Sequence, residues 1–168
     1  MKRILIWDVE TNGLSPLFGD RATAIGCKVM DSNEGLLVSE YDECLLLKKF
    51  EKWFKENTDE KTILCGYNHI KFDIPFIYTR FLKNGLDAPE FLLEKKIIDP
   101  FTIAQKWISL NDMAKILNVD VRKNGTGFEA IKLWEQGRID ELLMYLKQDL
   151  VVTEAVVKKL IEIGTLKV

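Results

Sequence analysis

Residues 2–14 read KRILIWDVETNGL, and the rest of the chain can be interpreted outward from them. Lys2 to Trp7 is a short apolar run with isoleucines and a tryptophan, bounded by polar residues, which is typical of a buried strand. Asp8 and Glu10 follow directly, and residues 11–13 have the composition of a turn. Residues two apart in a strand face the same side, so both carboxylates should point together from the carboxyl end of this strand.

The remaining pattern predicts an α/β domain in which helices cover a mixed sheet. The order of elements is strand, hairpin, helix, strand, helix, strand and then helices. The further predicted strands cover residues 22–30, 35–41, 62–66 and 97–98, and the predicted helices cover residues 44–57, 75–83, 111–117, 127–136 and 141–163. We find no internal repeat and no linker, so residues 1–168 are expected to form a single domain.

Composition agrees with a soluble globular protein. Hydrophobic residues make up 47% of the 168 residues and charged residues 30%. Because 24 Lys and Arg face 26 Asp and Glu, the net charge is −2, which excludes a globally basic, nucleic-acid-binding surface. A local basic groove around an acidic, metal-filled centre remains compatible with this balance.

Cysteine and histidine usage argues against a zinc site. Cys27, Cys44 and Cys65 form no CxxC pair, and His69 is the only histidine. The apolar run before Asp8 is too short for a signal peptide, and no stretch approaches about 18 apolar residues. We therefore expect a cytoplasmic protein with no membrane partner.

The last predicted helix carries a carboxylate on its apolar side. At ~100° per residue, Asp149 falls near the centre of a stripe formed by Leu142, Leu146, Thr153, Val156, Val157 and Leu160. A buried carboxylate must be paired, protonated or bound to metal, because an isolated buried charge is very costly. Tyr145 lies four residues earlier on the edge of the same face, so its hydroxyl can reach the region of Asp149.

Each carboxylate taken alone also has a purely structural interpretation. Asp8 and Glu10 can be a polar strand terminus, Asp149 can pair with a buried neighbour, and Asp73, two residues before Pro75, can cap a helix. If all four converge, however, each like-charge pair at ~4 Å costs about 4 kcal/mol. No lysine or arginine lies in the stripe with Asp149, so the spacing predicts that two divalent cations, Mg²⁺ or Mn²⁺, offset this repulsion.

Three segments resemble the exonuclease motifs of the DEDD superfamily. They are residues 8–14 (DVETNGL), 66–73 (GYNHIKFD) and 145–149 (YLKQD). The YxxxD pattern resembles the DEDDy branch, which includes the proofreading domains of family B DNA polymerases. The DEDDh branch has a histidine where this chain has Met144. Residues 125–153 also resemble predicted RNase H-like nucleases of bacteria and archaea.

This resemblance implies a ribonuclease H-like fold with a five-stranded mixed sheet, the first strand central. It implies hydrolysis of a single-stranded nucleic acid from its 3′ end, releasing nucleoside 5′-monophosphates. Carried over by position, Asp8 would bridge two ions, Glu10 and Asp149 would complete the first site, and Asp73 would hold the second. Tyr145 would orient the attacking water; its ordinary pKa of about 10 makes it a poor general base.

The resemblance also implies a pocket for the terminal nucleotide. Its residues would be Thr11, Asn12, Gly13, Leu14, Asn68 and Phe72; core packing is an equal alternative for Phe72. Arg122, Lys123 and Lys132 could contact phosphates, although solvated side chains are the simpler interpretation of each. His69 matches no catalytic position and is expected at a turn or core edge.

Other functions remain open at this stage. They are a binding module of the same fold without turnover, an endonuclease of the same fold, and a phosphatase whose first strand ends in an acidic pair. The sequence does not distinguish DNA from RNA, because contacts to the 2′-hydroxyl cannot be placed. Nor does it identify a polymerase or repair partner.

Overall fold

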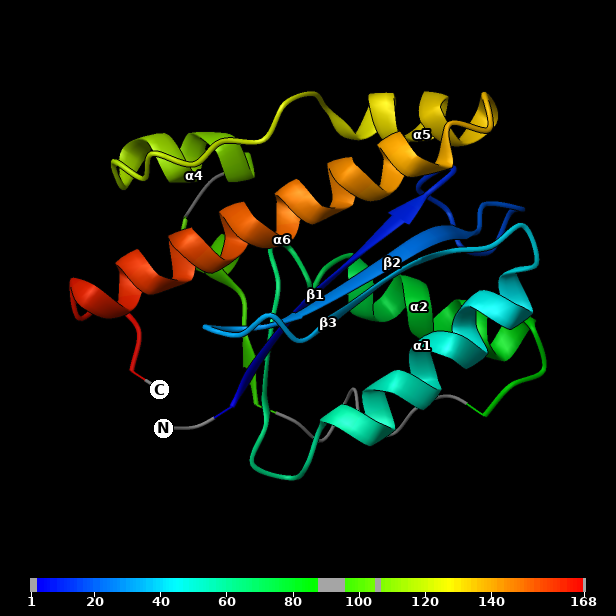
Figure 1. The fold of residues 1–168 in the computed structure, drawn as a ribbon, viewed down its shortest axis with the longest axis horizontal. Coiled ribbons are helices and arrows are strands. Elements are labelled where there is room, and N and C mark those ends of the chain that lie inside the picture. Colours follow the sequence, from blue (N-terminus) through cyan, green and yellow to red (C-terminus); the bar gives the residue numbers. More distant parts are fainter. Residues whose placement is uncertain (1–2, 88–95, 105–106, 168) are drawn as a thin grey trace.

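The computed structural model describes residues 3–87, 96–104 and 107–167, so Lys2 of the predicted first strand lies outside the described residues (Figure 1). The sheet has five strands in the order β3-β2-β1-β4-β5. Strand β1 is antiparallel to β2 and parallel to β4, and β5 is parallel to β4. The strands are β1 Ile4–Thr11, β2 Ala22–Val29, β3 Gly35–Ser39, β4 Ile63–Cys65 and β5 Ile97–Ile98. The predicted mixed sheet with its first strand central is confirmed.

Helices cover both faces of the sheet. The described helices are α1 Glu43–Asn57, α2 Asp73–Lys83, α4 Leu110–Ile116, α5 Gly127–Glu135 and α6 Ile139–Glu162, with a 3₁₀ turn at Pro100–Ile103. Figure 1 shows α1 and α2 on one side of the sheet and the long α6 on the other, with α4 and α5 beyond α6. No helix in the described ranges is long and apolar enough to cross a membrane.

Alternation along β1 decides which side chains meet which helices. Leu5, Trp7 and Val9 join the core formed with α1 and α2. Ile4 and Ile6 instead pack with residues of α6. Because side chains alternate along a strand, Asp8 and Glu10 continue the series of Ile4 and Ile6 and lie on the α6 side.

Helix α6 lies close against the sheet at Gly26 of β2, the residue paired with Asp8. A Cβ atom at Gly26 would lie 2.9 Å from side-chain atoms of both Leu146 and Leu150. Only a residue without a side chain permits this approach. The close packing brings the middle of α6, and with it Asp149, onto the carboxylates of β1.

Several boundaries differ from the sequence prediction. The ladder with β2 carries β1 through Thr11, beyond the predicted end at Trp7, with an irregularity between Glu10 and Thr11. Helix α2 begins at Asp73, so this residue is not the predicted cap; Phe72 holds that position without a side-chain bond. Glu154 of α6 is buried although it lies outside the apolar stripe, and its carboxylate lies 2.6 Å from Lys28 Nζ.

Candidate metal centre

Two elements bring three of the four predicted carboxylates together. Strand β1 supplies Asp8 and Glu10, and α6 supplies Asp149. Each can offer one oxygen such that the three atoms lie within 4.8 Å of one another. These distances suit ligands of one small cation, since oxygens bind Mg²⁺ at about 2.1 Å and opposite ligands are therefore about 4.2 Å apart.

Asp73 approaches from the other side of β1. Its Oδ1 accepts a hydrogen bond from the Val9 backbone amide at 3.4 Å, between the two acidic residues of the strand. Asp8, His69 and Asp73 form a second group with ligand atoms within 4.8 Å. Asp8 belongs to both groups, which is the arrangement that two ions sharing one ligand require.

Burial and mutual repulsion make the charged forms of these groups unfavourable. Burial raises the pKa of Asp8, and Asp73, Glu10 and Asp149 raise it further. Burial likewise raises the pKa of Glu10, and it raises the pKa of Asp73 to about 8. Asp149 Oδ1 is buried and has no hydrogen-bond partner among the residues that the structure describes. An all-oxygen set with an unsatisfied oxygen fits a hard divalent cation.

Lys123 provides a permanent positive charge inside this cluster. Its Nζ lies 2.7 Å from Asp149 Oδ2 and donates a hydrogen bond to the Tyr145 hydroxyl at 2.8 Å. The expectation of a solvated Lys123 is therefore wrong, as is the expectation that bound ions alone relieve the repulsion. The helical periodicity of α6 could not reveal this contact, because Lys123 lies outside that helix.

Backbone contacts hold the segment that carries Lys123. The Asn111 side chain accepts from the Lys123 amide at 3.1 Å and donates to the Lys123 carbonyl at 3.0 Å. The next residue, Asn124, donates its amide to Gln148 Oε1 of α6 at 3.0 Å. Lys123 is thus fixed to both α4 and α6.

Tyr145 is buried beside Asp149 on α6. Burial, followed by the charge of Asp149, raises the pKa of its phenol, while Lys123 opposes the shift. The hydroxyl therefore keeps its proton at neutral pH. Because it accepts a bond from Lys123, its own O–H remains available to orient a water or a phosphate oxygen.

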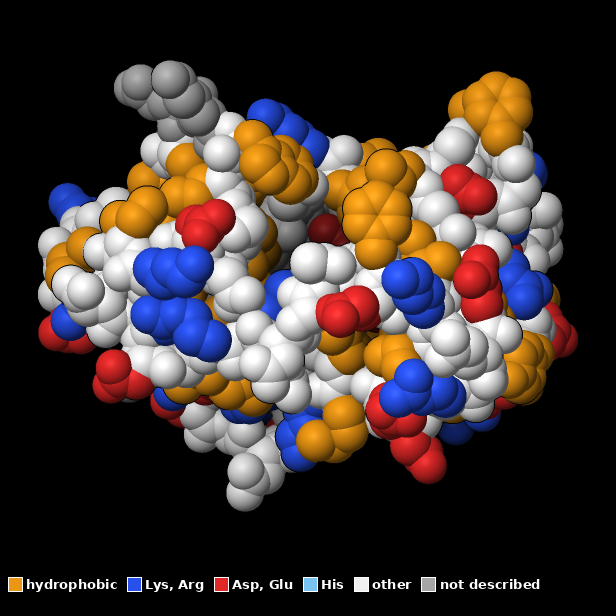
Figure 2. Space-filling model, turned by 90° about the horizontal axis from the view of Figure 1, so that it is seen from above, with side chains coloured by type: hydrophobic (Ala, Val, Ile, Leu, Met, Phe, Trp, Pro, Cys, Tyr) orange, Lys and Arg blue, Asp and Glu red, His pale blue; other side chains and the backbone are white. Residues whose placement is uncertain are grey.

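A cavity of about 670 Å³ opens over Asp8, Glu10, Lys123 and Asp149. Figure 2 shows a hollow on this side of the molecule, with an acidic side chain in its depth and hydrophobic side chains along its rim. The structure brings four of the six predicted nucleotide contacts to this cavity; they are Thr11, Leu14, Asn68 and Phe72.

The other two predicted contacts, Asn12 and Gly13, are absent from the residues described as lining this cavity. The Asn12 side chain accepts from the Arg21 amide at 2.6 Å. A side chain on Gly13 would collide with the carboxylate of Asp20, which itself accepts from the Ser15 amide. Both residues shape the loop after β1.

Asp99 supports the turn after β4, and the sequence analysis did not identify it as a candidate site residue. Its carboxylate accepts from the amides of Asn68 at 2.8 Å and Ile70 at 3.0 Å. Asn68 has a φ of +64°, a conformation that asparagine tolerates better than most residues. Parallel strands end at one sheet edge, so an acid after β5 was the signal that could have placed Asp99 near this turn.

His69 is fully buried, and its ring centroid lies 4.2 Å from that of Trp7. Within the described part of the chain, neither ring nitrogen makes a hydrogen bond of normal geometry, and Nε2 lies 3.9 Å from Asp73 Oδ2. Burial lowers the pKa of His69 to about 3, weakly opposed by the Trp7 backbone, so the ring is neutral. The second ligand group therefore contains a neutral nitrogen donor, which the motif comparison did not assign.

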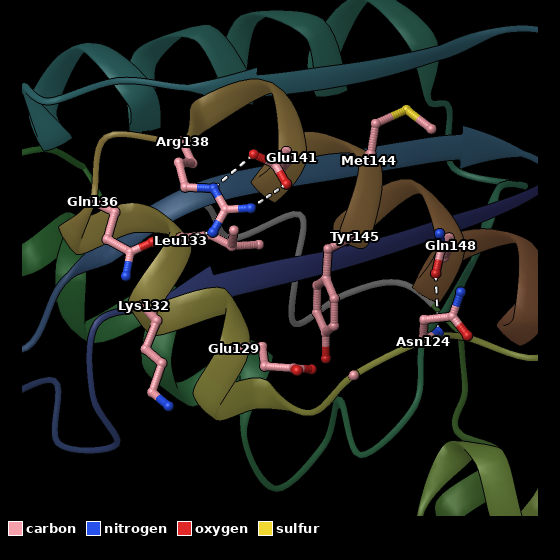
Figure 3. A pocket seen from close by; sticks show the side chains of 11 residues that line it. Asn124, Glu129, Lys132, Leu133, Gln136, Arg138, Glu141, Met144, Tyr145 and Gln148 are labelled. Carbon is pink, nitrogen blue, oxygen red and sulfur yellow. Dashed lines mark hydrogen bonds and ion pairs between the residues drawn. The ribbon is translucent and has the colours of Figure 1, made fainter.

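A second pocket, of about 490 Å³, lies between α5 and α6 (Figure 3). Tyr145 points into it, beside Glu129 and the exposed Lys132, and Arg138 pairs with Glu141 along its edge. No carboxylate of the metal centre is among the residues described as lining it. Tyr145 and Lys132 are described as lining this second pocket and not the first cavity, although the Tyr145 hydroxyl contacts Lys123, which lines the first.

A family model for the RNase H superfamily matches residues 5–161. The chain belongs to the RNase H superfamily. Solved structures that share this fold include the following two. The family B DNA polymerase of the hyperthermophilic archaeon Pyrobaculum calidifontis aligns with a TM-score of 0.79 and 18% identity, over 96% of this chain and 25% of the polymerase. The chain matches no curated protein.

The second solved structure is the zinc-bound complex of E. coli exonuclease I (ExoI) with single-stranded DNA. It aligns with a TM-score of 0.65 and 14% identity, over 98% of this chain and 41% of that protein. The predicted ribonuclease H-like fold is confirmed, and the neighbours are of the kinds that the three motifs predicted. The RNase H-superfamily chain spans well under half the length of either neighbour.

Proposed function

We propose that this chain is a divalent-metal-dependent nuclease domain, spanning residues 1–168, that shortens single-stranded nucleic acid from its 3′ end. The observation that carries the proposal is the pair of ligand groups that share Asp8. Further support comes from the family and from exonuclease I, whose complex contains single-stranded DNA. The raised carboxyl pKa values indicate a site that favours added positive charge.

In this proposal Asp8, Glu10 and Asp149 hold one cation, and Asp8 and Asp73 hold the second. When bound, two such cations acidify the attacking water and stabilise the departing 3′ oxygen. The bond between phosphorus and that oxygen breaks, so the shortened strand keeps a 3′ hydroxyl. The released nucleotide keeps its 5′ phosphate.

Tyr145 and Lys123 together position the attacking water. The Tyr145 O–H orients the attacking water, and the Lys123 ammonium holds the phenol oxygen and one oxygen of Asp149 in place. Fixed groups of this kind accelerate a reaction by keeping the reactants aligned. Thr11, Leu14, Asn68 and Phe72 line the space for the terminal nucleotide.

Strands labelled at the 5′ end test the proposal. DNA and RNA of matched sequence are incubated with Mg²⁺, with Mn²⁺ or with a chelator. We expect a ladder that shortens from the 3′ end only when a divalent ion is present. Glu10→Gln, prepared in the same way, should leave the strand intact and so excludes a contaminating nuclease.

The same assay separates the competing functions. A circular single strand has no end, so its cleavage would show an endonuclease and contradict the proposal. Binding without hydrolysis in both metals would indicate a module that has lost turnover. Hydrolysis of free phosphate esters, with strands left intact, would indicate a phosphatase.

A further inference from the structure

Two strongly exposed aromatic side chains line the same cavity as the carboxylates. Trp107 is 77% exposed and Phe128 is 76% exposed. Trp107 lies just before α4, and Phe128 lies in the first turn of α5. Figure 1 shows these two helices at opposite ends of α6, so the aromatics reach the cavity from separate segments.

Aromatic contacts position Trp107. Its ring packs edge-on against Phe101, with centroids 5.1 Å apart, and Tyr67 also packs edge-on against Phe101, with centroids 5.7 Å apart. The Tyr67 hydroxyl donates to the carbonyl of Ile108 at 2.7 Å and so ties this segment to the loop after β4. Trp107 therefore packs against Phe101 while most of its side chain faces solvent.

Phe128 is held by the start of α5. Thr126 and Glu129 form a capping box, in which the Thr126 amide donates to the Glu129 carboxylate at 2.8 Å. The buried face of α5 consists of Ala130 and Trp134, and Phe128 lies off that face. Its exposure thus follows from the orientation of a well-anchored helix.

Isolated exposed hydrophobics are ordinary, but two rings at one charged cavity call for a ligand with both flat apolar faces and anionic groups. Unpaired nucleobases on a phosphate backbone match this description, since every base has a face on which an aromatic ring can stack. Two cations lie near these rings. Lys123 lines the cavity, where it pairs with Asp149, and Lys71 Nζ lies 5.2 Å from the centre of the Phe101 ring against which Trp107 packs. An apolar peptide would bring no negative charge for these cations.

We propose that Trp107 and Phe128 stack on unpaired bases near the 3′ end and thereby select single strands over paired ends. The proposal rests on the function proposed above, which supplies the end bound at the carboxylates. Bases inside a duplex already stack on their neighbours, so a paired end offers neither ring a free face. Selection therefore requires strand separation at the end, without any reading of base identity.

Binding measured separately from hydrolysis tests this inference. A fluorescently labelled oligodeoxynucleotide is titrated with the full chain by anisotropy, with Ca²⁺ and without divalent ions. Trp107→Ala and Phe128→Ala should each weaken binding roughly 5- to 100-fold, the range expected for loss of one stacked base. Trp107→Phe should restore most of the affinity, because it keeps an aromatic face.

Strands with abasic sites near the 3′ end make the test specific to stacking. Wild type should bind such strands more weakly than base-bearing strands. Trp107→Ala should lower the affinity for the abasic strands little further. Phe18→Ala is the matched control, because Phe18 is 87% exposed and is not among the described residues lining this cavity. Circular dichroism verifies that each variant is folded.

Two results would overturn the inference. One is equal affinity of wild type for abasic and base-bearing strands. The other is an effect of Trp107→Ala no larger than that of Phe18→Ala. Because both results come from binding measurements, they test base stacking even if the protein does not hydrolyse strands. Absence of hydrolysis would refute only the proposed nuclease function. Conversely, normal 3′ shortening with unchanged affinity of both variants would refute the stacking alone.

Discussion

Two buried acidic sites in this molecule solve the same electrostatic problem in different ways. Glu43 of α1 lies against Arg80 of α2, whose Nε and Nη2 donate to the two carboxylate oxygens at 2.8 and 2.5 Å. Asn84 and the Ala22 amide complete its hydrogen bonds. The four carboxylates of the candidate metal centre, Asp8 included, by contrast share one lysine among the described cations, and one of their buried oxygens has no partner in the described ranges.

The difference shows that burial of acids does not by itself mark a functional site. The Glu43–Arg80 pair is complete within the chain, so it holds α1, α2 and β2 together permanently. The carboxylates around Asp8 leave a buried oxygen of Asp149 without a partner among the described residues, which is compatible with the cations of the proposed function. Variants at the two sites should therefore differ in their effects on hydrolysis and on folding stability.

The largest effect should come from removing the carboxylate shared by both ligand groups. Asp8→Asn should reduce the rate of strand hydrolysis by about a thousandfold or more, because both cations lose a ligand. The metal-free variant should unfold at a temperature equal to or above that of wild type, since one repulsive charge is gone. Thermal denaturation in chelator measures the unfolding temperature, and a single-turnover assay measures the hydrolysis rate. A marked loss of metal-free stability would contradict this assignment.

The opposite result is expected at the paired site. Arg80→Ala should lower the free energy of unfolding by about 3–5 kcal/mol, because Glu43 is left buried without its cation. The folded fraction should keep its hydrolysis rate per molecule. Urea denaturation, with activity measured well below the transition, tests this. Arg80→Ala hydrolysing strands as poorly as Asp8→Asn while folded would remove the distinction between the two sites.

The metal centre should also make stability depend on pH and on added metal. Asp73 has its pKa raised to about 8 in the folded chain, above the ordinary value of 3.8. The folded state therefore holds its proton more tightly, and without metal the free energy of unfolding falls as pH rises through this window.

Cations bind the ionised form, so Mn²⁺ should stabilise the protein more at pH 8 than at pH 5. At a hundredfold excess over the dissociation constant, the gain is about 2.7 kcal/mol. Thermal unfolding with Mn²⁺ or with chelator, at both pH values, gives the comparison, with Asp8→Asn as control. Equal stabilisation at the two pH values would contradict the prediction.

The smallest effect concerns the one internal cation of the metal centre. Lys123→Met should slow hydrolysis by roughly tenfold, since misalignment of Tyr145 costs about 1.4 kcal/mol of the activation free energy. It should also tighten Mn²⁺ binding, because a positive charge 2.7 Å from Asp149 is lost. Isothermal titration and single-turnover kinetics separate the two effects. Weaker Mn²⁺ binding would show that Lys123 supports the site in another way.

Much of the fold followed from local patterns. The apolar run before Asp8 predicted a buried strand, and period-3.6 patterning predicted α1 and α6 to within two residues at each end. The placement of Asp149 in the apolar stripe also came from this periodicity. These features depend on neighbours along the chain, which a sequence displays directly.

The missed features involve residues far apart along the chain. Lys123 and Asp149 are 26 positions apart. Asp99 accepts hydrogen bonds from Asn68 and Ile70, which precede it by 31 and 29 positions. Trp107 and Phe128 share one cavity although neither belongs to the three exonuclease-like motifs. Such contacts depend on how α4, α5 and the intervening segment pack on α6, which no local pattern encodes.

The amino-acid order alone determined that acidic side chains would stand at the end of the first strand and on the core face of the last helix, since strand and helix periods dictate both. Only the tertiary structure decided which of them received a cation from the chain itself. That outcome depends on distances of a few ångströms between segments, and Coulomb energy in a buried site changes steeply over such distances.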